Sequence, residues 1–204
     1  MCVTRTRLCS KGNHINVLGI SGTPRPGGNS EILLKAALEP FAEAGWDTTT
    51  ILLSEKKIEM CIGCDSCQAG NGCVHNDDMV EIYKAFKACD AIIIAAPTYY
   101  RNVPAQLKAV FDRTYALPQN PLRGRFGGAI AVGRSTGGGG QSMVLSTIYT
   151  YLLSCGALCV SGELNGVSAS ADKPGDILEQ PRRLEQARML GKNIISCDAD
   201  RAAR

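Results

Sequence analysis

The chain is poor in aromatic residues, in histidine and in excess charge of either sign. Among its 204 residues 5% are aromatic, 2 are histidines, and the formal net charge is +3. So mild a charge does not predict binding to nucleic acid or to an anionic membrane. No apolar run approaches the roughly 20 residues of a membrane-spanning helix, and residues 1–14 lack the apolar segment of a secretion signal. We therefore expect a cytoplasmic protein that works without nucleic acid or membrane.

Recognisable hydrolytic machinery is also missing. Neither a Ser-His-Asp arrangement nor a pair of carboxylates is evident, which disfavours hydrolysis. Cysteine and glycine, in contrast, are plentiful, with 10 and 22 residues. Cysteine makes up about one residue in twenty, below the roughly 8–10% of disulfide-held scaffolds. Four of the cysteines fall between Cys61 and Cys73, and this clustering is the first indication of function.

Short apolar runs alternate with stretches of helical periodicity along the chain. Strands are expected at residues 15–20, 48–53, 91–96, 127–132 and 157–160, and helices at 30–44, 79–88, 104–114, 141–154 and 177–195, where Pro181 offers a later start. This alternation predicts a doubly wound α/β fold, with a five-stranded parallel sheet in the flavodoxin-like order 2-1-3-4-5. We expect a single domain over residues 1–204, comprising an N-terminal tail at 1–13, a cysteine-rich insertion at 58–78 after the second strand, and a C-terminal tail at 196–204.

The loop after the first strand has the chemistry of a phosphate site. It carries hydroxyl, cationic, amide and glycine residues that lead directly into a helix: Ser21, Thr23, Arg25, Gly28, Asn29 and Ser30. Helix N-termini expose N–H groups and attract anions, and glycine lets the backbone approach a ligand. The loop is neither G-x-G-x-x-G nor a Walker P-loop. The alternative is a flexible turn in which Ser30 is a plain N-cap.

The loops after the third and fourth strands suit a planar ligand. The third strand is followed by two aromatic rings and hydrogen-bonding groups, at Pro97, Thr98, Tyr99, Tyr100 and Asn102. The alternative for each tyrosine is packing against a neighbouring helix. The fourth strand is followed by Ser135, Thr136 and a glycine run from Gly137 to Gly140, for which a mobile lid is the alternative.

The expected strand order brings these three loops together. Strands one, three and four are neighbours in it, so their carboxyl ends border one crevice at the switch point of the sheet. A phosphate cradle beside loops that can hold a flat ring predicts a mononucleotide site. FMN fits best, because a dinucleotide would normally need the absent G-x-G-x-x-G turn.

The clustered cysteines have the spacing C-x2-C-x2-C-x5-C, formed by Cys61, Cys64, Cys67 and Cys73. Bacterial ferredoxins share the C-x2-C-x2-C start, but their fourth cysteine comes sooner, precedes proline and serves another cluster. A single [4Fe-4S] cluster on these four thiolates is the most economical interpretation. Zinc, which usually takes two more widely separated knuckles, and metal-free thiols remain as alternatives. His75 is either an exposed loop residue or a hydrogen-bond donor to a cluster sulfur.

The remaining cysteines indicate less. We expect Cys89, Cys155 and Cys159 to be small buried residues next to apolar segments. Cys2, Cys9 and Cys197 are placed in the expected tails.

Three segments together resemble a known family. The loop from Ser21 to Ser30, the stretch PTYYRNVPAQLKAVFDR at residues 97–113 and the glycine run before Gln141 are similar to the NADPH-dependent FMN reductase-like superfamily. With the four cysteines, the chain resembles its iron–sulfur flavoprotein branch over about residues 16–167. The resemblance implies a flavodoxin-like fold, bound FMN, a [4Fe-4S] cluster, a homodimer or homotetramer, and electron transfer from ferredoxin or NAD(P)H to an acceptor.

The resemblance also implies residue roles. It assigns the FMN phosphate to Ser21, Thr23, Arg25, Asn29 and Ser30, and the isoalloxazine ring to Pro97, Thr98, Tyr99, Asn102, Ser135, Thr136 and Gly137. The chain departs from the pattern at Arg101, where similar proteins have glycine or another small residue.

Two other functions stay open at this point. One is an NAD(P)H-dependent FMN or quinone reductase without a cluster, for which NAD(P)H would be a substrate. The other is a non-enzymatic thiol-based sensor of redox state or metal, which uses the segment Cys61 to Cys73 as a switch. The three hypotheses differ in iron content and in turnover.

Overall fold

A parallel β-sheet forms the centre of the computed structural model, which describes residues 15–134, 140–163 and 165–203. Its strands follow the order β2-β1-β3-β4-β5, with β6 also paired to β4. The strands are β1 (Asn16–Ser21), β2 (Asp47–Leu52), β3 (Ala91–Pro97), β4 (Phe126–Gly133), β5 (Leu158–Cys159) and β6 (Val167–Ser170). All the pairings are parallel. The flavodoxin-like order expected from the sequence is thus confirmed.

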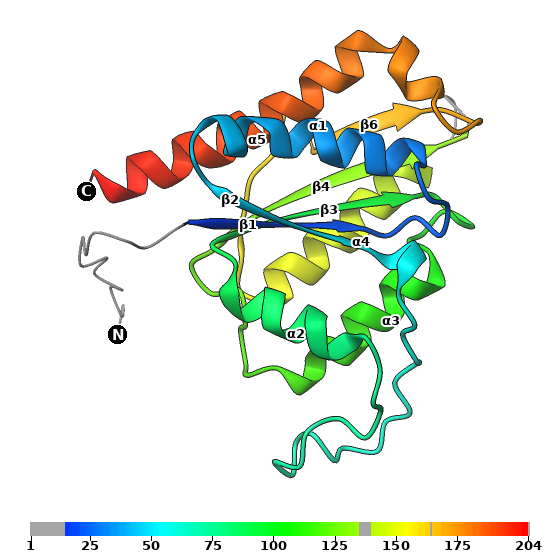
Figure 1. The fold of residues 1–204 in the computed structure, drawn as a ribbon, viewed down its shortest axis with the longest axis vertical. Helices are drawn as coiled ribbons and strands as arrows, with labels where there is room; N and C mark the ends of the chain where they lie inside the picture. The colour runs from blue at the N-terminus through cyan, green and yellow to red at the C-terminus, as the bar shows by residue number, and fades with distance from the viewer. Residues whose placement is uncertain (1–14, 135–139, 164, 204) are drawn as a thin grey trace.

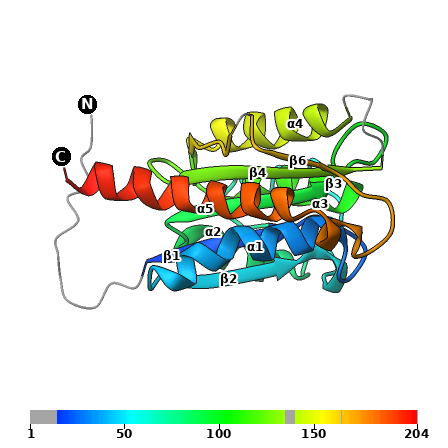
Figure 2. The ribbon, with the colours of Figure 1, turned by 90° about the horizontal axis from the view of Figure 1, so that it is seen from above.

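Helices cover both faces of this sheet (Figure 1). α1 and α5 lie side by side on one face, as Figure 2 shows, and α2, α3 and α4 lie on the other. The helices are α1 (Asn29–Glu43), α2 (Met79–Ala88), α3 (Ala105–Arg113), α4 (Gly140–Ser154) and α5 (Pro181–Ala202), with short 3-10 turns η1 (Leu53–Glu55), η2 (Thr114–Ala116) and η3 (Asp176–Glu179). No helix in these described ranges is long and apolar enough to cross a membrane.

Burial on both faces explains the apolar runs of the central strands. Within β1, Val17 faces the core under α1 and α5, whereas Leu18 faces the core under α2, α3 and α4. β3 repeats this alternation, with Ile93 in the first core and Ile92 in the second. Because successive side chains of a strand point to opposite faces, a strand between two helical layers must be apolar at nearly every position.

The edge of the sheet beyond β4 differs from the prediction. A single fifth strand was expected at residues 157–160, but the place is shared by the two-residue β5 and by β6. β5 pairs with the start of β4, at Phe126 and Gly127, and β6 pairs with its end, where Val167 lies opposite Ile130. The sequence of β6 carries small and hydroxyl side chains and therefore lacks the apolar run by which the other strands were predicted.

The predicted C-terminal tail at residues 196–204 is wrong for most of these residues. α5 continues to Ala202, so residues 196–202 are helical rather than a tail, and Cys197 is a half-buried helix residue. The helix begins at Pro181, where the missing N–H of proline costs no hydrogen bond. α5 stays helical because Leu190 and Ile194 are buried in the core shared with α1. The predicted N-terminal tail, with Cys2 and Cys9, lies outside the described residues.

Candidate functional site

The loop between β1 and α1 contains buried hydroxyls that have no partner in the described structure. Ser21 is fully buried and Ser30 is 2% exposed, yet neither side-chain oxygen has a hydrogen-bond partner among the described residues. The same holds for the hydroxyl of Thr98, which follows β3. Buried hydroxyls are nearly always hydrogen-bonded, so three hydroxyls without a partner at one end of the sheet indicate a polar ligand. Their position fits the expected phosphate site.

The backbone of this loop is held in shape by its own polar groups. The N–H of Arg25 donates to the hydroxyl of Thr23 over 3.2 Å, and the N–H of Gly27 donates to the Glu31 carboxylate over 2.9 Å. A side chain at Gly28 would bring Cβ to 3.0 Å from the Thr23 hydroxyl and 3.1 Å from the Arg25 carbonyl. A side chain at position 28 would therefore press on both groups, which glycine avoids.

The structure gives the Asn29 side chain another use. Its amide donates to the carbonyl of Lys173 over 2.8 Å, and its Oδ1 accepts from the N–H groups of Gly175 and Ile177 over 3.0 and 3.3 Å. Asn29 therefore ties the segment between β6 and α5 to the start of α1. Arg25, by contrast, is exposed at the rim of the loop.

A strained turn follows β3. Tyr99 and Asn102 exchange two backbone hydrogen bonds of 2.8 and 3.0 Å, and the two residues between them have positive φ angles, 47° at Tyr100 and 63° at Arg101. Two-residue turns of this type favour glycine or asparagine, and each bulky residue there costs about 1–2 kcal/mol. Tyr100 is fully exposed, so its ring does not pack against a helix as the alternative held, and Tyr99 is 41% exposed. The turn presents two aromatic rings at the carboxyl end of β3.

Close approaches hold neighbouring elements together at this end of the sheet. A Cβ at Gly22 would lie 2.7 Å from Leu107 of α3, and one at Gly140 would lie 2.7 Å from Thr98. Asn102 is fixed by its side-chain oxygen, which accepts from the N–H of Val103 and from the hydroxyl of Thr147. The predicted site residues Ser135, Thr136 and Gly137 lie outside the described residues. The loops after β1 and β3 thus meet at one edge of the sheet, next to the N-terminal ends of α1 and α3.

The cysteine loop, residues 56–78 between η1 and α2, has no helix or strand and projects from the body below α2 and α3 (Figure 1). Its four clustered cysteines are free thiols, and all four line one cavity of about 130 Å³ together with His75 and Tyr115. Within the described ranges, no three His, Cys, Asp or Glu side chains surround a single point as the ligands of one ion would. A [4Fe-4S] cluster takes one thiolate on each iron, so four cysteines on one cavity match its number of ligands.

Tight turns bring these cysteines to the cavity. Gly63, Gly70 and Gly72 have positive φ angles, and Asp65 has one of 51°. The Asp65 carbonyl accepts the N–H groups of residues 68 and 69 over 3.0 and 3.2 Å, which closes a turn around Cys67. The side-chain amide of Gln68 donates to the Cys67 sulfur over 3.8 Å and to the Tyr115 carbonyl over 2.9 Å. His75 is half-buried, and its Nε2 has no partner among the described residues.

Three cysteines outside the cluster were predicted to be buried, and the structure confirms two of them. Cys89 and Cys155 are buried as expected, and burial raises the pKa of the Cys89 thiol to about 11. Cys159 is exposed, contrary to the prediction, because β5 is a two-residue edge strand with both residues on the surface. None of the three lines the cavity of the cysteine loop.

An ion pair at the base of the cysteine loop was not predicted from the sequence. Arg113, the last residue of α3, donates from both terminal nitrogens to the Asp77 carboxylate, over 2.7 and 3.0 Å. The side chains are only 1% and 7% exposed. Asp77 also accepts from the N–H of Met79, the first residue of α2, over 3.1 Å. No local pattern announces a pair whose members lie 36 residues apart.

This pair makes loop stability depend on pH. Hydrogen bonding from Arg113 lowers the pKa of Asp77 from 3.8 to about 2, although burial opposes the shift. The stabilisation is complete above about pH 4 and is lost as the pH falls toward 2, and the linked free energy is about 2 kcal/mol. In urea unfolding between pH 6 and pH 2, we expect the difference between wild type and Asp77→Asn to shrink by that amount. Parallel pH profiles for the two proteins would contradict the pairing.

This chain is similar to known proteins over most of its length. The family model for NADPH-dependent FMN reductase matches residues 15–169. An iron–sulfur flavoprotein of Methanocaldococcus jannaschii is 39% identical over 186 residues, which cover 88% of this chain and 95% of the relative. An iron–sulfur flavoprotein of Methanosarcina thermophila is 41% identical over 140 residues, covering 68% and 73%. In fold, the chain is similar to an NAD(P)H:quinone oxidoreductase from Methanothermobacter marburgensis, with a TM-score of 0.69 at 20% identity, covering 89% of this chain and all of the other.

Proposed function

The chain belongs to the iron–sulfur flavoproteins of the NADPH-dependent FMN reductase family, and from this premise we propose that it transfers electrons through FMN and a [4Fe-4S] cluster. That it is an FMN-dependent oxidoreductase follows from the family. The cluster, its ligands and the electron donor are the parts proposed. The observation that carries the proposal is the convergence of four free cysteines on one cavity.

The loops at the carboxyl ends of β1 and β3 have the groups that would bind FMN. We assign its phosphate to the loop from Ser21 to Ser30, where the buried hydroxyls of these two serines have no partner among the described residues. We assign its ring to the turn after β3, with Thr98, Tyr99 and Asn102 beside it. FMN supplies the redox chemistry when bound, so the protein needs no catalytic acid or base of its own. The chain orients the nucleotide with loops that hold their shape by internal hydrogen bonds.

The cluster would be held by Cys61, Cys64, Cys67 and Cys73. Hydrogen bonds to the sulfurs and the surrounding charge set the potential of such a cluster. The amide of Gln68 already donates to one sulfur, and Tyr115 forms part of the cavity wall. Free thiols also support a reducing, cytoplasmic location.

The electron donor is proposed to be a ferredoxin-like protein or NAD(P)H. Met60, Ile62 and Val74 expose more than half of their surfaces on the cysteine loop. Exposed apolar groups around a redox centre support contact with another protein there. We include assembly as a homodimer or homotetramer in the proposal.

The deciding experiment measures iron, sulfide and FMN per chain in protein produced and kept without oxygen. We expect about four irons, four sulfides and one FMN, and a brown protein with absorbance beyond the flavin bands. A plain yellow protein without iron would overturn the cluster and favour the cluster-free NAD(P)H reductase instead.

A further inference from the structure

We propose that Arg113 is a positioning residue for the cysteine loop: it closes the base of the loop and places a buried positive charge there, which raises the reduction potential of the cluster. This inference rests on the proposed function for its second half. The closure of the loop base can be tested without any cluster.

The first observation is that Arg113 binds both ends of the loop. Besides the two bonds to Asp77, its Nη1 donates to the carbonyl of Glu59 over 2.9 Å. Glu59 lies two residues before the first clustered cysteine, and Asp77 lies four after the last. The N–H of Glu59 in turn donates to the Asp77 carboxylate over 2.9 Å. The guanidinium of Arg113 therefore fixes the distance between the two ends of the loop.

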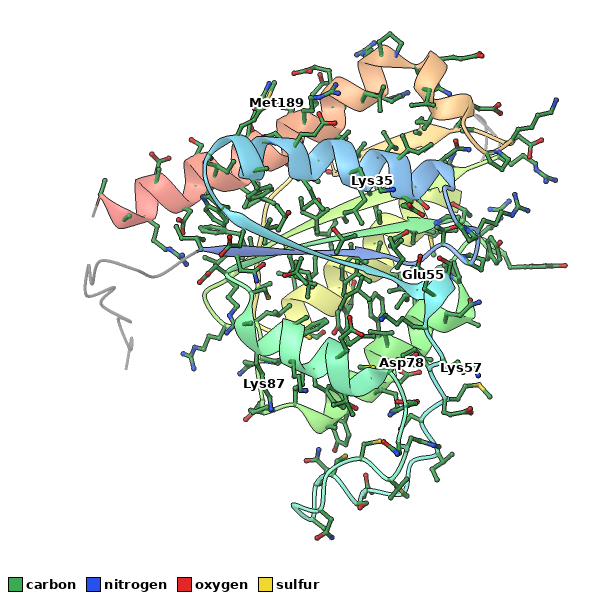
Figure 3. All side chains as sticks on the ribbon, in the orientation of Figure 1. Lys35, Glu55, Lys57, Asp78, Lys87 and Met189 are labelled. Atoms are coloured by element: carbon green, nitrogen blue, oxygen red, sulfur yellow. The ribbon has the colours of Figure 1, made fainter. Side chains whose placement is uncertain are left out.

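A second contact pair strengthens the same base. The N–H of Lys57 donates to the Asp78 carboxylate over 2.8 Å, and the N–H of Asp78 donates to the Lys57 carbonyl over 3.3 Å. Figure 3 shows the two labelled residues side by side where the loop leaves the body. These bonds are exposed, however, whereas the Arg113 side chain is almost completely buried. Because water competes least for buried bonds, Arg113 contributes most to keeping the base closed.

The third observation is that Arg113 lies next to the cavity of the cysteine loop. Tyr115, two residues after Arg113, lines this cavity together with Cys73. The hydroxyl of Tyr83 on α2 donates to the backbone carbonyl of Arg113 over 2.9 Å and so fixes the end of α3 against α2. The buried guanidinium, held by the contacts described above, therefore places its charge at the base of the loop that carries the four cysteines.

The effect of Arg113 on the cluster potential can be tested by removing charges at the base of the loop. A cation near an iron–sulfur cluster favours the more negative, reduced state, and an anion disfavours it. Removing the positive charge with Arg113→Met should shift the midpoint potential to more negative values. Removing the negative charge with Asp77→Asn should shift it to more positive values. A purely structural role would not give shifts of opposite sign.

The experiment compares wild type, R113M, R113K and D77N, with Arg123→Met as a control that removes an exposed arginine outside the loop. Iron and FMN per chain are measured, and cluster potentials are titrated by electron paramagnetic resonance. We expect the three variants at the pair to lose iron several-fold faster than wild type with FMN retained. R113K keeps the charge, so its potential should stay near that of wild type, and R123M should behave as wild type throughout.

Limited proteolysis of the cluster-free proteins provides the second readout. Cleavage within residues 60–76 should be several-fold faster in R113K and D77N than in wild type and R123M. Equal cleavage and equal iron retention would overturn the positioning role, and potentials that shift together or not at all would overturn the electrostatic role. Wild-type protein without iron would instead overturn the proposed cluster, and proteolysis would still decide whether Arg113 closes the loop.

Discussion

Replacing Cys64 with alanine is expected to remove nearly all iron and sulfide from the protein while FMN stays bound. A [4Fe-4S] cluster needs a thiolate on each iron, so loss of one ligand exposes an iron to solvent and to oxidative loss. Cys64 is exposed and lies in a loop without helix or strand, so the substitution itself should cost the fold little. The FMN site is built from other loops and should be unaffected. Iron, sulfide and released FMN per chain measure the three parts of this prediction.

Cys159→Ala is the matched control for this variant. Cys159 is also an exposed thiol, but it belongs to β5 and does not line the cavity. Its removal should leave iron and FMN at wild-type levels. If C64A retains its iron, or if C159A loses as much, the four-cysteine ligand set is wrong. Steady NAD(P)H oxidation by metal-free protein, unchanged in C64A, would select the cluster-free reductase.

Removing the unpartnered hydroxyls of Ser21 and Ser30 is expected to weaken FMN binding strongly without destabilising the empty protein. A hydrogen bond to a charged group such as phosphate contributes roughly 1.5–3 kcal/mol, so each serine-to-alanine change should raise the Kd of FMN about 10- to 100-fold. Neither hydroxyl has a hydrogen-bond partner among the described residues. Their loss therefore breaks no bond within the protein part of the cradle. Flavin titration and urea unfolding of the apoprotein measure the two effects.

Ser154→Ala is the control for a serine with a satisfied hydroxyl. Ser154 ends α4, is exposed and donates to the carbonyl of Thr150 over 2.8 Å. This variant should bind FMN as wild type does. An apoprotein destabilised by S21A or S30A, or an unchanged Kd in the double variant, would show that these hydroxyls do not face the phosphate.

The sequence predicted the scaffold and the chemistry of its loops because both are local properties. An unbroken apolar run such as residues 91–96 identifies a strand covered on both faces, and β3 lies there. The order of strands then follows from the doubly wound topology. The serines and glycines after β1, and the four closely spaced cysteines, show their chemistry within a few positions. The convergence of the loops after β1 and β3, and of the four cysteines, could therefore be predicted from the sequence, and the residues that bind FMN stay a prediction.

The tertiary structure decided what depends on residues far apart in the chain. Asn29 is bound to the segment before α5, 144 to 148 residues away, rather than left for the phosphate. Arg113 meets Asp77 across 36 positions, since α3 and the cysteine loop are brought together only by packing. Likewise, β6 forms because β4 offers it a parallel edge, although its own residues give only a weak strand pattern. Local sequence sets which groups are available, and long-range packing determines the partners they reach, because contact energies between distant segments exist only once the chain has folded.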